Sequence, residues 1–572
     1  MTARIRLISV FIILVAGIIA VRLYFIQIVH GDSFTEEAKR QNTDKTTVSY
    51  NRGEIYFENK DGEKVPAAIS RSGYTIAINP KILKNPEKIY ENLNQFLSLD
   101  KNEFMDKVAK NDDVYEEVAK HVNAETTEKI KSLDLYGVSI STDKWRFYPG
   151  GKLASQTIGF VAYEGDDLAG RYGLERYYED VLKKDPSGAY NNFFAEFLSN
   201  VKETLSDFPK EEGSIVTTIE PSVQLFLEDE IKNTIDKWNS DAAGGIIINP
   251  MNGEIIAMAW NPTFDLNNFK EGDASVFRNN LVEGVYEMGS IIKALTMASG
   301  LDAGVVSATS TYYDAGFLVL NNKRISNYDG QGRGTVDMQE VLNQSLNTGA
   351  AYVALKMGNG KFAEYMKNFG VETETGIDLP NETHGLASNL NSTREIEMAT
   401  ASYGQGVAFT PIATVRALSS LANGGTLVTP HLVKKMEFDN GLSKKISFAP
   451  GKQVIKKETS EEITRMLVTV VDKALRGGTA KIPGYSVAAK TGTAQMTDEG
   501  RAGYVEGKYL HSFFGYFPAY KPQFLVFLFH IYPKGVRYAS ETLTDPFLEI
   551  TKFLLNYYQV PPDRPEDVTT QT

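Results

Sequence analysis

The chain of 572 residues contains no cysteine, and this absence removes several kinds of chemistry at once. Disulfide bonds, thiolate nucleophiles and cysteine-ligated metals are excluded. Histidine is scarce as well, with six residues: His30, His121, His384, His431, His511 and His530. None of them has the spacing of a histidine metal motif, so we predict no metal site and a structural role for each. A nucleic-acid partner is also not expected, because the net charge is −12 and no basic stripe occurs.

Long apolar runs are limited to one, at residues 7–29, where Arg22 is the only charged residue. Its length matches the roughly 20 residues that a helix needs to cross a bilayer. Arg4 and Arg6 precede it, and the positive-inside rule therefore places residues 1–6 in the cytoplasm. A cleaved signal peptide is the alternative, but no small-x-small cleavage site follows the run. We therefore predict an uncleaved single-pass anchor with the remaining chain outside the cytoplasm.

The rest of the chain is long enough for two domains, since one hydrophobic core usually stops growing near ~250–300 residues. Residues 30–214 are mixed and polar, with strand-like runs at Gly73–Asn79 and Val138–Ser141 and a charged helical pattern at Asn102–Lys120. The pattern becomes denser from a β-branched run near residue 215. We predict a mixed α/β domain over 30–214 and a second domain over 215–558.

The second domain reads as an α+β fold. An amphipathic helix is predicted at Gln224–Trp238. Strands are predicted at Gly244–Asn249, Glu254–Trp260, Val487–Gln495, His511–Phe517 and Gln523–Tyr532. The first two form a hairpin because an Asn-Gly pair supplies the turn between them. The pattern indicates one central antiparallel sheet, built from both ends of the domain and flanked by helices. Residues 559–572 are polar and contain proline, which indicates a disordered tail.

A candidate nucleophile and base lie one helical turn apart in Ser290-Ile291-Ile292-Lys293. The Ser-x-x-Lys pattern alone is weak, since it also occurs at Ser98, Ser141 and Ser199. Ser290 differs because it opens an apolar stretch that predicts a buried helix, whose N-terminus favours developing negative charge. Serine needs a base, and a lysine whose pKa is lowered by burial or by another cation can serve.

Two further motifs follow in the order that a serine acyl-transfer site requires, Ser345-Leu346-Asn347 and Lys490-Thr491-Gly492-Thr493. Ser345 can relay a proton, and the amide of Asn347 can hold a substrate backbone. Lys490 can lower the pKa of Lys293. Each motif alone is more often an ordinary helix cap or strand end. Their joint occurrence behind Ser290 favours the catalytic interpretation.

The Lys490-Thr491-Gly492-Thr493 motif is predicted to form the edge of a strand that binds the substrate. Lys490, Thr491 and Thr493 would present a charge and hydroxyls to an anionic substrate terminus. Gly492 would leave room for an extended substrate. The backbone N–H groups of Ser290 and Thr493 would form an oxyanion hole.

The chain resembles the class B penicillin-binding proteins over nearly its whole length. The segments that carry the resemblance are Tyr286–Lys293, Ser345–Asn347, Lys490–Gln495, Gly404–Gly406, Gly245–Met258, Arg52–Tyr56 and Gly173–Glu175. The resemblance implies a bacterial inner-membrane enzyme with one anchor, a pedestal (dimerisation-type) domain and a serine β-lactamase-like transpeptidase domain. It implies a peptidoglycan D,D-transpeptidase that binds stem peptides and β-lactams, has division or elongation membrane proteins as partners and uses no cofactor. The septal subtype is nearer than the elongation subtype.

Three departures from the family pattern stand out. Met288 replaces a common proline before the Gly-Ser pair, and Leu346 occupies a position where a smaller or polar residue is usual. The segment Phe57–Gly62 differs from the usual Asp-Arg-Asn-Gly pattern. The first two are expected to affect substrate fit or β-lactam reactivity, and none removes a catalytic group.

Two other functions remain open. In a D,D-carboxypeptidase or β-lactam-hydrolysing enzyme, water rather than an amine takes the acyl group. A catalytically silent division scaffold would bind partner membrane proteins through its anchor and pedestal. The intact motif trio favours an enzyme.

Overall fold

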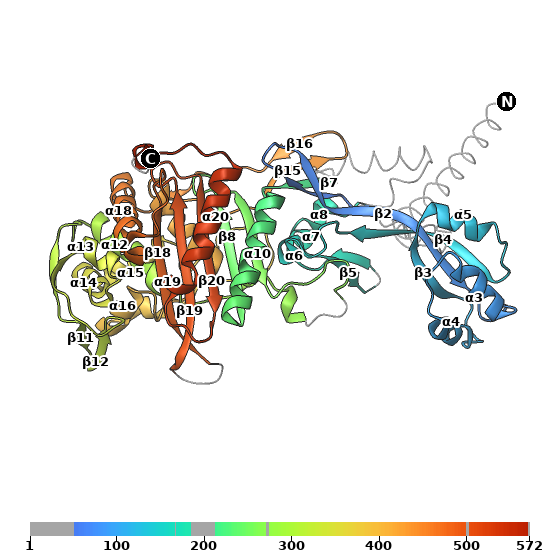
Figure 1. Cartoon of the computed structure of the whole chain (residues 1–572), viewed down its shortest axis with the longest axis horizontal. Helices are drawn as coiled ribbons and strands as arrows, with labels where there is room; N and C mark the ends of the chain where they lie inside the picture. The colour runs from blue at the N-terminus through green and yellow to red at the C-terminus, as the bar shows by residue number, and fades with distance from the viewer. Residues whose placement is uncertain (1–50, 166, 185–211, 270–273, 499–502, 570–572) are drawn as a thin grey trace, which may run out of the picture. The chain divides into compact units, whose positions relative to one another are not determined.

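The computed structural model describes residues 51–165, 167–184, 212–269, 274–498 and 503–569. The predicted anchor at 7–29 and the candidate serine Ser199 lie outside the described residues. Within the described ranges, each helix is too short or too polar to cross a bilayer. The described chain falls into two compact units (Figure 1). The smaller contains residues 70–146, and the larger contains 52–69, 147–184 and everything described from 212 onward.

The smaller unit is a short sheet covered by helices. The later residues of β2 (Lys64–Ile78) pair with β3 (Glu116–Val122) and β4 (Val138–Phe147). The helices are α3 (Pro86–Asn94), α4 (Lys101–Val108) and α5 (Ala124–Lys131). Ile76 and Ile78 from β2 meet Leu93 and Phe104 from two helices in a small core.

The charged helix predicted at Asn102–Lys120 is confirmed over its first part and wrong over its last part. Helix α4 ends at Val108, and the residues from Glu116 onward form strand β3. The apolar side of β3 is narrow, with Val118 and Val122 packed against the small core. Pairing with β2 and this packing outweigh the helical preference of the glutamates and lysines around them.

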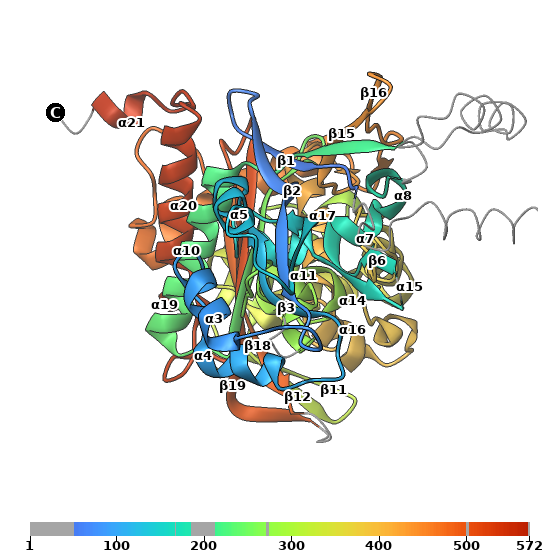
Figure 2. The same cartoon turned by 90° about the vertical axis from the view of Figure 1, so that its right-hand side faces the viewer.

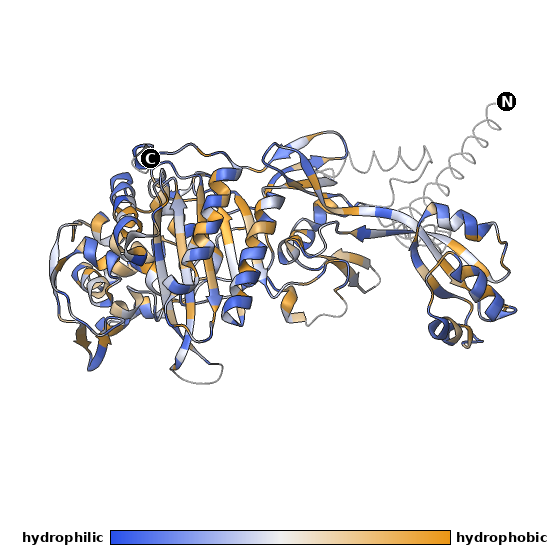
Figure 3. Ribbon diagram, in the orientation of Figure 1, coloured by the Kyte–Doolittle hydropathy of each residue, from blue (hydrophilic) through white to orange (hydrophobic). Residues whose placement is uncertain are grey.

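The larger unit is built on a five-stranded antiparallel sheet with the strand order β18-β19-β20-β8-β9. The strands are β8 (Ala242–Ile248), β9 (Ile255–Asn261), β18 (Ala488–Thr497), β19 (Tyr504–Phe517) and β20 (Phe524–Ile531). The predicted hairpin and the three predicted strands near the end of the domain are confirmed. Figure 3 shows the apolar residues concentrated in the central strands and in the helices that cover them.

Both faces of this sheet are buried, and successive residues alternate between them. Ile247 and Phe513 pack with helices α10 (Pro221–Trp238) and α20 (Thr544–Tyr557), which Figure 1 shows together on one face. Ile246 and Phe514 pack on the other face. That face is covered by α12 (Ile292–Asp302), α17 (Pro411–Ala422) and α18 (Lys457–Thr469). The helix predicted at Gln224–Trp238 is thus confirmed within α10.

A second sheet of the larger unit brings in residues from the first part of the chain (Figure 2). Strand β1 (Ile55–Glu58) pairs in parallel with β7 (Gly213–Thr217), the strand expected near residue 215. Strand β7 in turn pairs with β15 (Val433–Phe438). The larger unit therefore contains both the five-stranded sheet and segments 52–69 and 147–184. Both segments lie inside the range predicted for the pedestal.

The predicted disordered tail differs from the structure over its first part. Asp563 accepts hydrogen bonds from Ser486, and Arg564 forms an ion pair with Asp472 at 2.8 Å. Lys481 pairs with Asp567 at 2.9 Å. The charged residues of this segment have partners in the domain, and the polar, proline-containing composition that predicted a disordered tail does not reveal such partners.

We predict that Arg52→Ala destabilises the larger unit. The Nε atom of Arg52 donates to the Glu175 carboxylate at 2.6 Å, and both side chains are buried. Removing the cation leaves a buried carboxylate uncompensated, which typically costs about 3–5 kcal/mol. Thermal unfolding followed by circular dichroism should show a lower midpoint. The control is Arg394→Ala, which breaks a partly exposed ion pair with Glu397 and should change stability by at most about 0.5 kcal/mol. Equal midpoints for both variants would contradict the prediction.

Candidate active site

Ser290 lies in the 3-10 turn η4 (Gly289–Ile291), which leads directly into helix α12. The predicted buried helix is confirmed, since every residue from Ile292 to Gly300 is buried. Ser290 itself is half-buried at the start of this helix, whereas Lys293, one turn further on, is 1% exposed. The helix thus places the serine at the surface of the core and the lysine amine inside it.

Strand β18 passes against this turn so closely that both contact positions require glycine. A Cβ atom on Gly492 would lie 2.7 Å from the carbonyl oxygen of Met288 and 3.0 Å from the backbone nitrogen of Ile291. A Cβ atom on Gly289 would lie 2.6 Å from the carbonyl oxygen of Thr493. Gly492 therefore has a packing reason besides the predicted one of leaving room for a substrate. This backbone contact is what brings Ser290 to the lysine motif of β18.

The two lysines meet at the hydroxyl of Ser345. Lys293 Nζ donates to the backbone oxygen of Ser345 at 2.5 Å and lies 3.2 Å from its Oγ. Lys490 Nζ donates to the same Oγ at 2.9 Å and to the carbonyl oxygen of Thr491 at 3.0 Å. The structure therefore brings together one residue from each of the three predicted motifs, although they come from distant parts of the chain.

Burial makes both amines weak bases. Desolvation, and then the neighbouring charge of Lys490, hold the pKa of Lys293 well below its ordinary value of 10.5. Burial alone lowers the pKa of Lys490, which is 2% exposed, to about 7. Because the two ammonium groups would share one hydroxyl, the pair does not hold two protons near neutral pH. Burial thus favours the neutral form of both amines, and the charge of Lys490 favours the neutral form of Lys293 further.

Ser345 has a left-handed backbone conformation, with φ of +53°, which is unusual for a residue with a side chain. It lies in the turn between α13 (Met338–Asn343) and α14 (Asn347–Met357). The neighbouring Leu346 is fully buried in the core, and its backbone N–H is bonded to the carbonyl of Val341. Anchoring of Leu346 and the two lysine contacts hold Ser345 in this conformation.

The remaining predicted residues have contacts within the protein. Asn347 Nδ2 donates to the carbonyl oxygen of Ser326 at 2.8 Å. Thr493 Oγ1 accepts a hydrogen bond from the backbone N–H of Ala539 at 3.1 Å. Thr491 is half-buried on β18 beside Lys490, whose ammonium its carbonyl accepts. Asn347 and Thr493 thus each have one structural partner in addition to any substrate contact.

Two departures from the family pattern are packing residues. Met288 and Leu346 are both fully buried. The carbonyl of Met288 accepts a hydrogen bond from the Ser512 hydroxyl at 2.7 Å. Their side chains therefore act on the site through the backbone turns that they anchor.

Sequence reasoning missed Tyr403. The Nζ atom of Lys293 lies 6.0 Å from the centroid of its ring, and the residue follows α16 (Glu395–Ala401). The only signal was the neighbouring Gly404-Gln405-Gly406, where Gly404 accepts a hydrogen bond from the Gly289 N–H at 3.2 Å. No group of three potential metal-ligating His, Asp or Glu side chains occurs in the described part of the chain.

Family models match two parts of the chain. The model described as "Penicillin binding protein transpeptidase domain" matches residues 243–551, and "Penicillin-binding Protein dimerisation domain" matches residues 47–218. Among curated proteins, the chain is 33% identical over 558 residues to "Stage V sporulation protein D" of Bacillus subtilis, covering 96% of this chain and 84% of that one. It is 26% identical over 562 residues to "Peptidoglycan D,D-transpeptidase FtsI" of Buchnera aphidicola subsp. Schizaphis graminum, covering 97% and 94%.

Among solved structures, Penicillin Binding Protein 2X from Streptococcus thermophilus aligns with a TM-score of 0.72 at 20% identity, over 90% of this chain and 81% of that chain. At this identity the likeness concerns the fold.

We predict that Lys490→Met stabilises the protein in a pH-dependent way. The pKa of Lys490 is about 7 in the folded state and near 10.5 in the unfolded chain, so protonation favours unfolding as the pH falls from 10.5 to 7. At pH 6 the free energy of unfolding of the variant should exceed that of the wild type by about 1–3 kcal/mol, which a higher unfolding temperature would report. This gain should shrink toward pH 10. The exposed Lys444→Met is the control and should show no such trend. A gain that is equal at both pH values would contradict the electrostatic cause.

Proposed function

The chain belongs to the penicillin-binding proteins, and from this membership we propose how its site carries out the reaction of a serine-type peptidoglycan D,D-transpeptidase. The enzyme cross-links stem peptides in cell-wall synthesis. The observation that carries the proposal is the meeting of two buried lysines on the Ser345 hydroxyl beside the turn that holds Ser290.

In the first step, Ser290 Oγ attacks the penultimate D-alanine carbonyl of a stem peptide. A neutral lysine amine has two N–H groups and one lone pair. Lys293 directs its N–H groups to the two oxygens of Ser345, so its lone pair is available for the Ser290 proton. The Ser345 hydroxyl then gives its proton to the leaving amine and receives from Lys293 the proton taken from Ser290, which leaves Lys293 neutral again. The carbon–nitrogen bond breaks, terminal D-alanine leaves, and an ester to Ser290 remains.

Charge stabilisation comes from β18 and the start of α12. The Ser290 and Thr493 backbone N–H groups form the oxyanion hole, which the close approach of Gly289 to Thr493 supports. Lys490, Thr491 and Thr493 hold the substrate carboxylate, while the Asn347 amide binds the peptide backbone. Gly492 keeps the strand edge open.

In the second step, an amine from a neighbouring stem peptide attacks the ester and gives one proton to Lys293. The carbon–oxygen bond to Ser290 breaks, and Lys293 returns the proton to the Ser290 oxygen. Water in place of the amine would make the protein a D,D-carboxypeptidase or a β-lactam-hydrolysing enzyme. β-Lactams acylate the same serine in this scheme.

The finer organisation is also a proposal. Residues 7–29 anchor the chain in the bacterial cytoplasmic membrane with 1–6 inside, because the run is apolar and two arginines precede it. Residues 30–214 act as a pedestal and 215–558 as the transpeptidase domain. A septal role, with division membrane proteins as partners, rests on the sequence resemblance.

The first test is labelling with a fluorescent penicillin. We expect the wild type to become covalently labelled and Ser290→Ala to lose labelling entirely, because the Ser290 hydroxyl is the nucleophile in the proposed mechanism. The matched control is Ser141→Ala, which removes the serine of another Ser-x-x-Lys sequence, on β4, and should label normally. Undiminished labelling of Ser290→Ala would refute the assignment.

An assay with an added acceptor, carried out on the wild-type protein, distinguishes a transpeptidase from a hydrolase. With a D-alanyl-D-alanine peptide and an added amine acceptor, a transpeptidase yields the amide product. Release of the free acid alone would favour the carboxypeptidase.

The anchor is tested by deleting residues 1–29 from the chain. We expect the full-length protein to sediment with membranes and to leave them only in detergent, and the truncated protein to be recovered in the soluble fraction. A full-length protein released by high salt or found soluble would contradict the anchor.

A further inference from the structure

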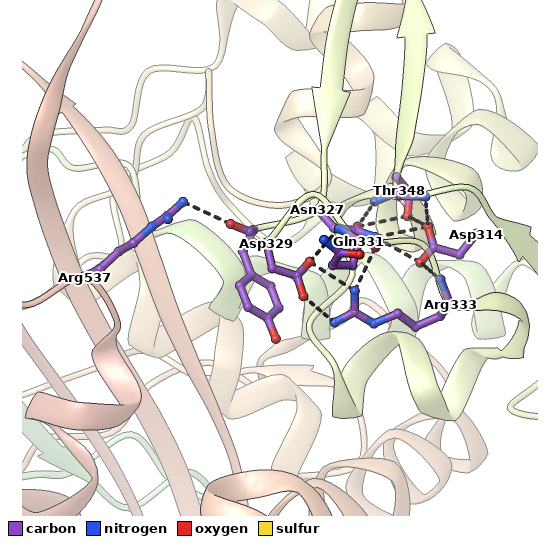
Figure 4. A network of polar contacts seen from close by, with 9 residues as sticks. Asp314, Asn327, Asp329, Gln331, Arg333, Thr348 and Arg537 are labelled. Atoms are coloured by element: carbon purple, nitrogen blue, oxygen red, sulfur yellow. Dashed lines mark hydrogen bonds and ion pairs between the residues drawn. The ribbon is translucent and has the colours of Figure 1, made fainter.

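Asp314 is a buried carboxylate that is held by hydrogen bonds and not by an ion pair with any described residue. It lies at the end of β10 (Thr311–Asp314), is 1% exposed and forms no ion pair there. Its oxygens accept hydrogen bonds from the Thr348 hydroxyl at 2.8 Å, from Asn327 Nδ2 at 3.0 and 3.1 Å, and from the backbone N–H groups of Gly316 and Arg333 at 2.9 and 3.0 Å (Figure 4).

This one carboxylate holds both sides of a contact in the active site. Asn347 of the second motif donates to the carbonyl of Ser326. Thr348, which follows Asn347, bonds Asp314, and so does Asn327, which follows Ser326. Asn327 Oδ1 also accepts from the Thr348 backbone N–H at 3.3 Å. The separation of the two partners of the Asn347 bond is therefore fixed by residues bound to the same carboxylate.

The loop that follows Ser326, the last residue of β12 (Lys323–Ser326), is also held from its far side. Arg333 forms an ion pair with Asp329 at 2.7 Å within the loop. Arg537 Nη2, from the segment that precedes α19 (Ala539–Thr542), donates to the carbonyl of Tyr328 at 3.0 Å (Figure 4). The loop therefore has little freedom to follow Asn347 if the bonds to Asp314 are lost.

Burying a carboxylate without a cation is unfavourable for stability, even when hydrogen bonds surround it. A polar network of this kind fixes one geometry, because any displacement leaves a charged oxygen unsatisfied. The group whose geometry it fixes is the Asn347 amide. Among the described residues its second N–H and its Oδ1 atom have no partner, so both are available to a peptide backbone.

We propose that Asp314 is a positioning residue that sets the orientation of the Asn347 amide toward the substrate, through Thr348 on one side and Asn327 on the other. This rests on the proposed function, in which Asn347 binds the acyl donor. Asp314 does not touch the substrate and acts only through Asn347.

The primary variant is Asp314→Asn, which keeps the shape of the side chain but replaces one acceptor oxygen with a donor that faces other donors. We expect the second-order rate of acylation by a fluorescent penicillin to fall about 10- to 100-fold, as for a small misplacement of a binding group. The matched control is Asp378→Asn. Asp378 is also buried and accepts from two backbone N–H groups and the Tyr178 hydroxyl, but it contacts none of the motif residues. Its acylation rate should remain that of the wild type.

A double-mutant cycle separates positioning from general damage. If Asp314 acts through Asn347, the Asp314→Asn change should lower the rate of an Asn347→Ala protein by less than about twofold, because the positioned amide is already gone. Equal fold-losses in both backgrounds would overturn the proposal, as would an unaffected Asp314→Asn single variant.

If Asp314→Asn does not fold, the same cycle is made with Thr348→Val, which removes the hydroxyl donor, and Thr348→Ser should restore most of the lost rate. A Thr348→Val loss that persists equally in the Asn347→Ala background overturns the proposal. Absence of labelling at Ser290 in the wild type would refute the proposed function and this inference with it. Wild-type labelling with an unaffected variant refutes the inference alone.

Discussion

The site depends on burying two lysine amines around one serine hydroxyl. Water would solvate both ammonium groups and leave each as an inactive acid at neutral pH. Inside the core, desolvation lowers both pKa values, and the charge that remains on Lys490 lowers that of Lys293 further. The helix that carries Lys293 is buried from Ile292 to Gly300, which keeps water away from the amine. A general base is thus produced without histidine. Because the charge on Lys490 lowers the pKa of Lys293 only at short range, the two lysines must stay close.

Close backbone approach is the second constraint, and glycine makes it possible. Strand β18 can lie against the Ser290 turn only because Gly492 and Gly289 have no side chains at the contact. The strand is held in place by the central sheet, whose members come from both ends of the domain. The catalytic geometry is therefore a property of the assembled sheet and of the helix packed on it, and no single segment would adopt it alone.

The polar groups around the site follow a common pattern in which stability is given up for geometry. Ser345 has a left-handed backbone, Lys293 and Lys490 are buried amines, and Asp314 is a buried carboxylate that forms no ion pair among the described residues. Each arrangement is unfavourable by itself. The large apolar core on both faces of the sheet supplies the stability that allows them.

The sequence by itself determined the elements with strong periodicity or a turn signal. These include the Asn-Gly hairpin of β8 and β9, the three late strands, helix α10 and the buried helix after Ser290, because burial patterns of period 2 and 3.6 are local properties. It also determined the chemical inventory, since the absence of cysteine and the order of three motifs left few reactions open. Tertiary structure alone decided the strand β3, the pairing of β1 with β7 and the partners of the tail, because those depend on residues far along the chain. It also decided which carboxylate orients Asn347 and that both amines reach the same hydroxyl. Distances between remote residues and the desolvation that shifts a pKa arise only when the chain is packed.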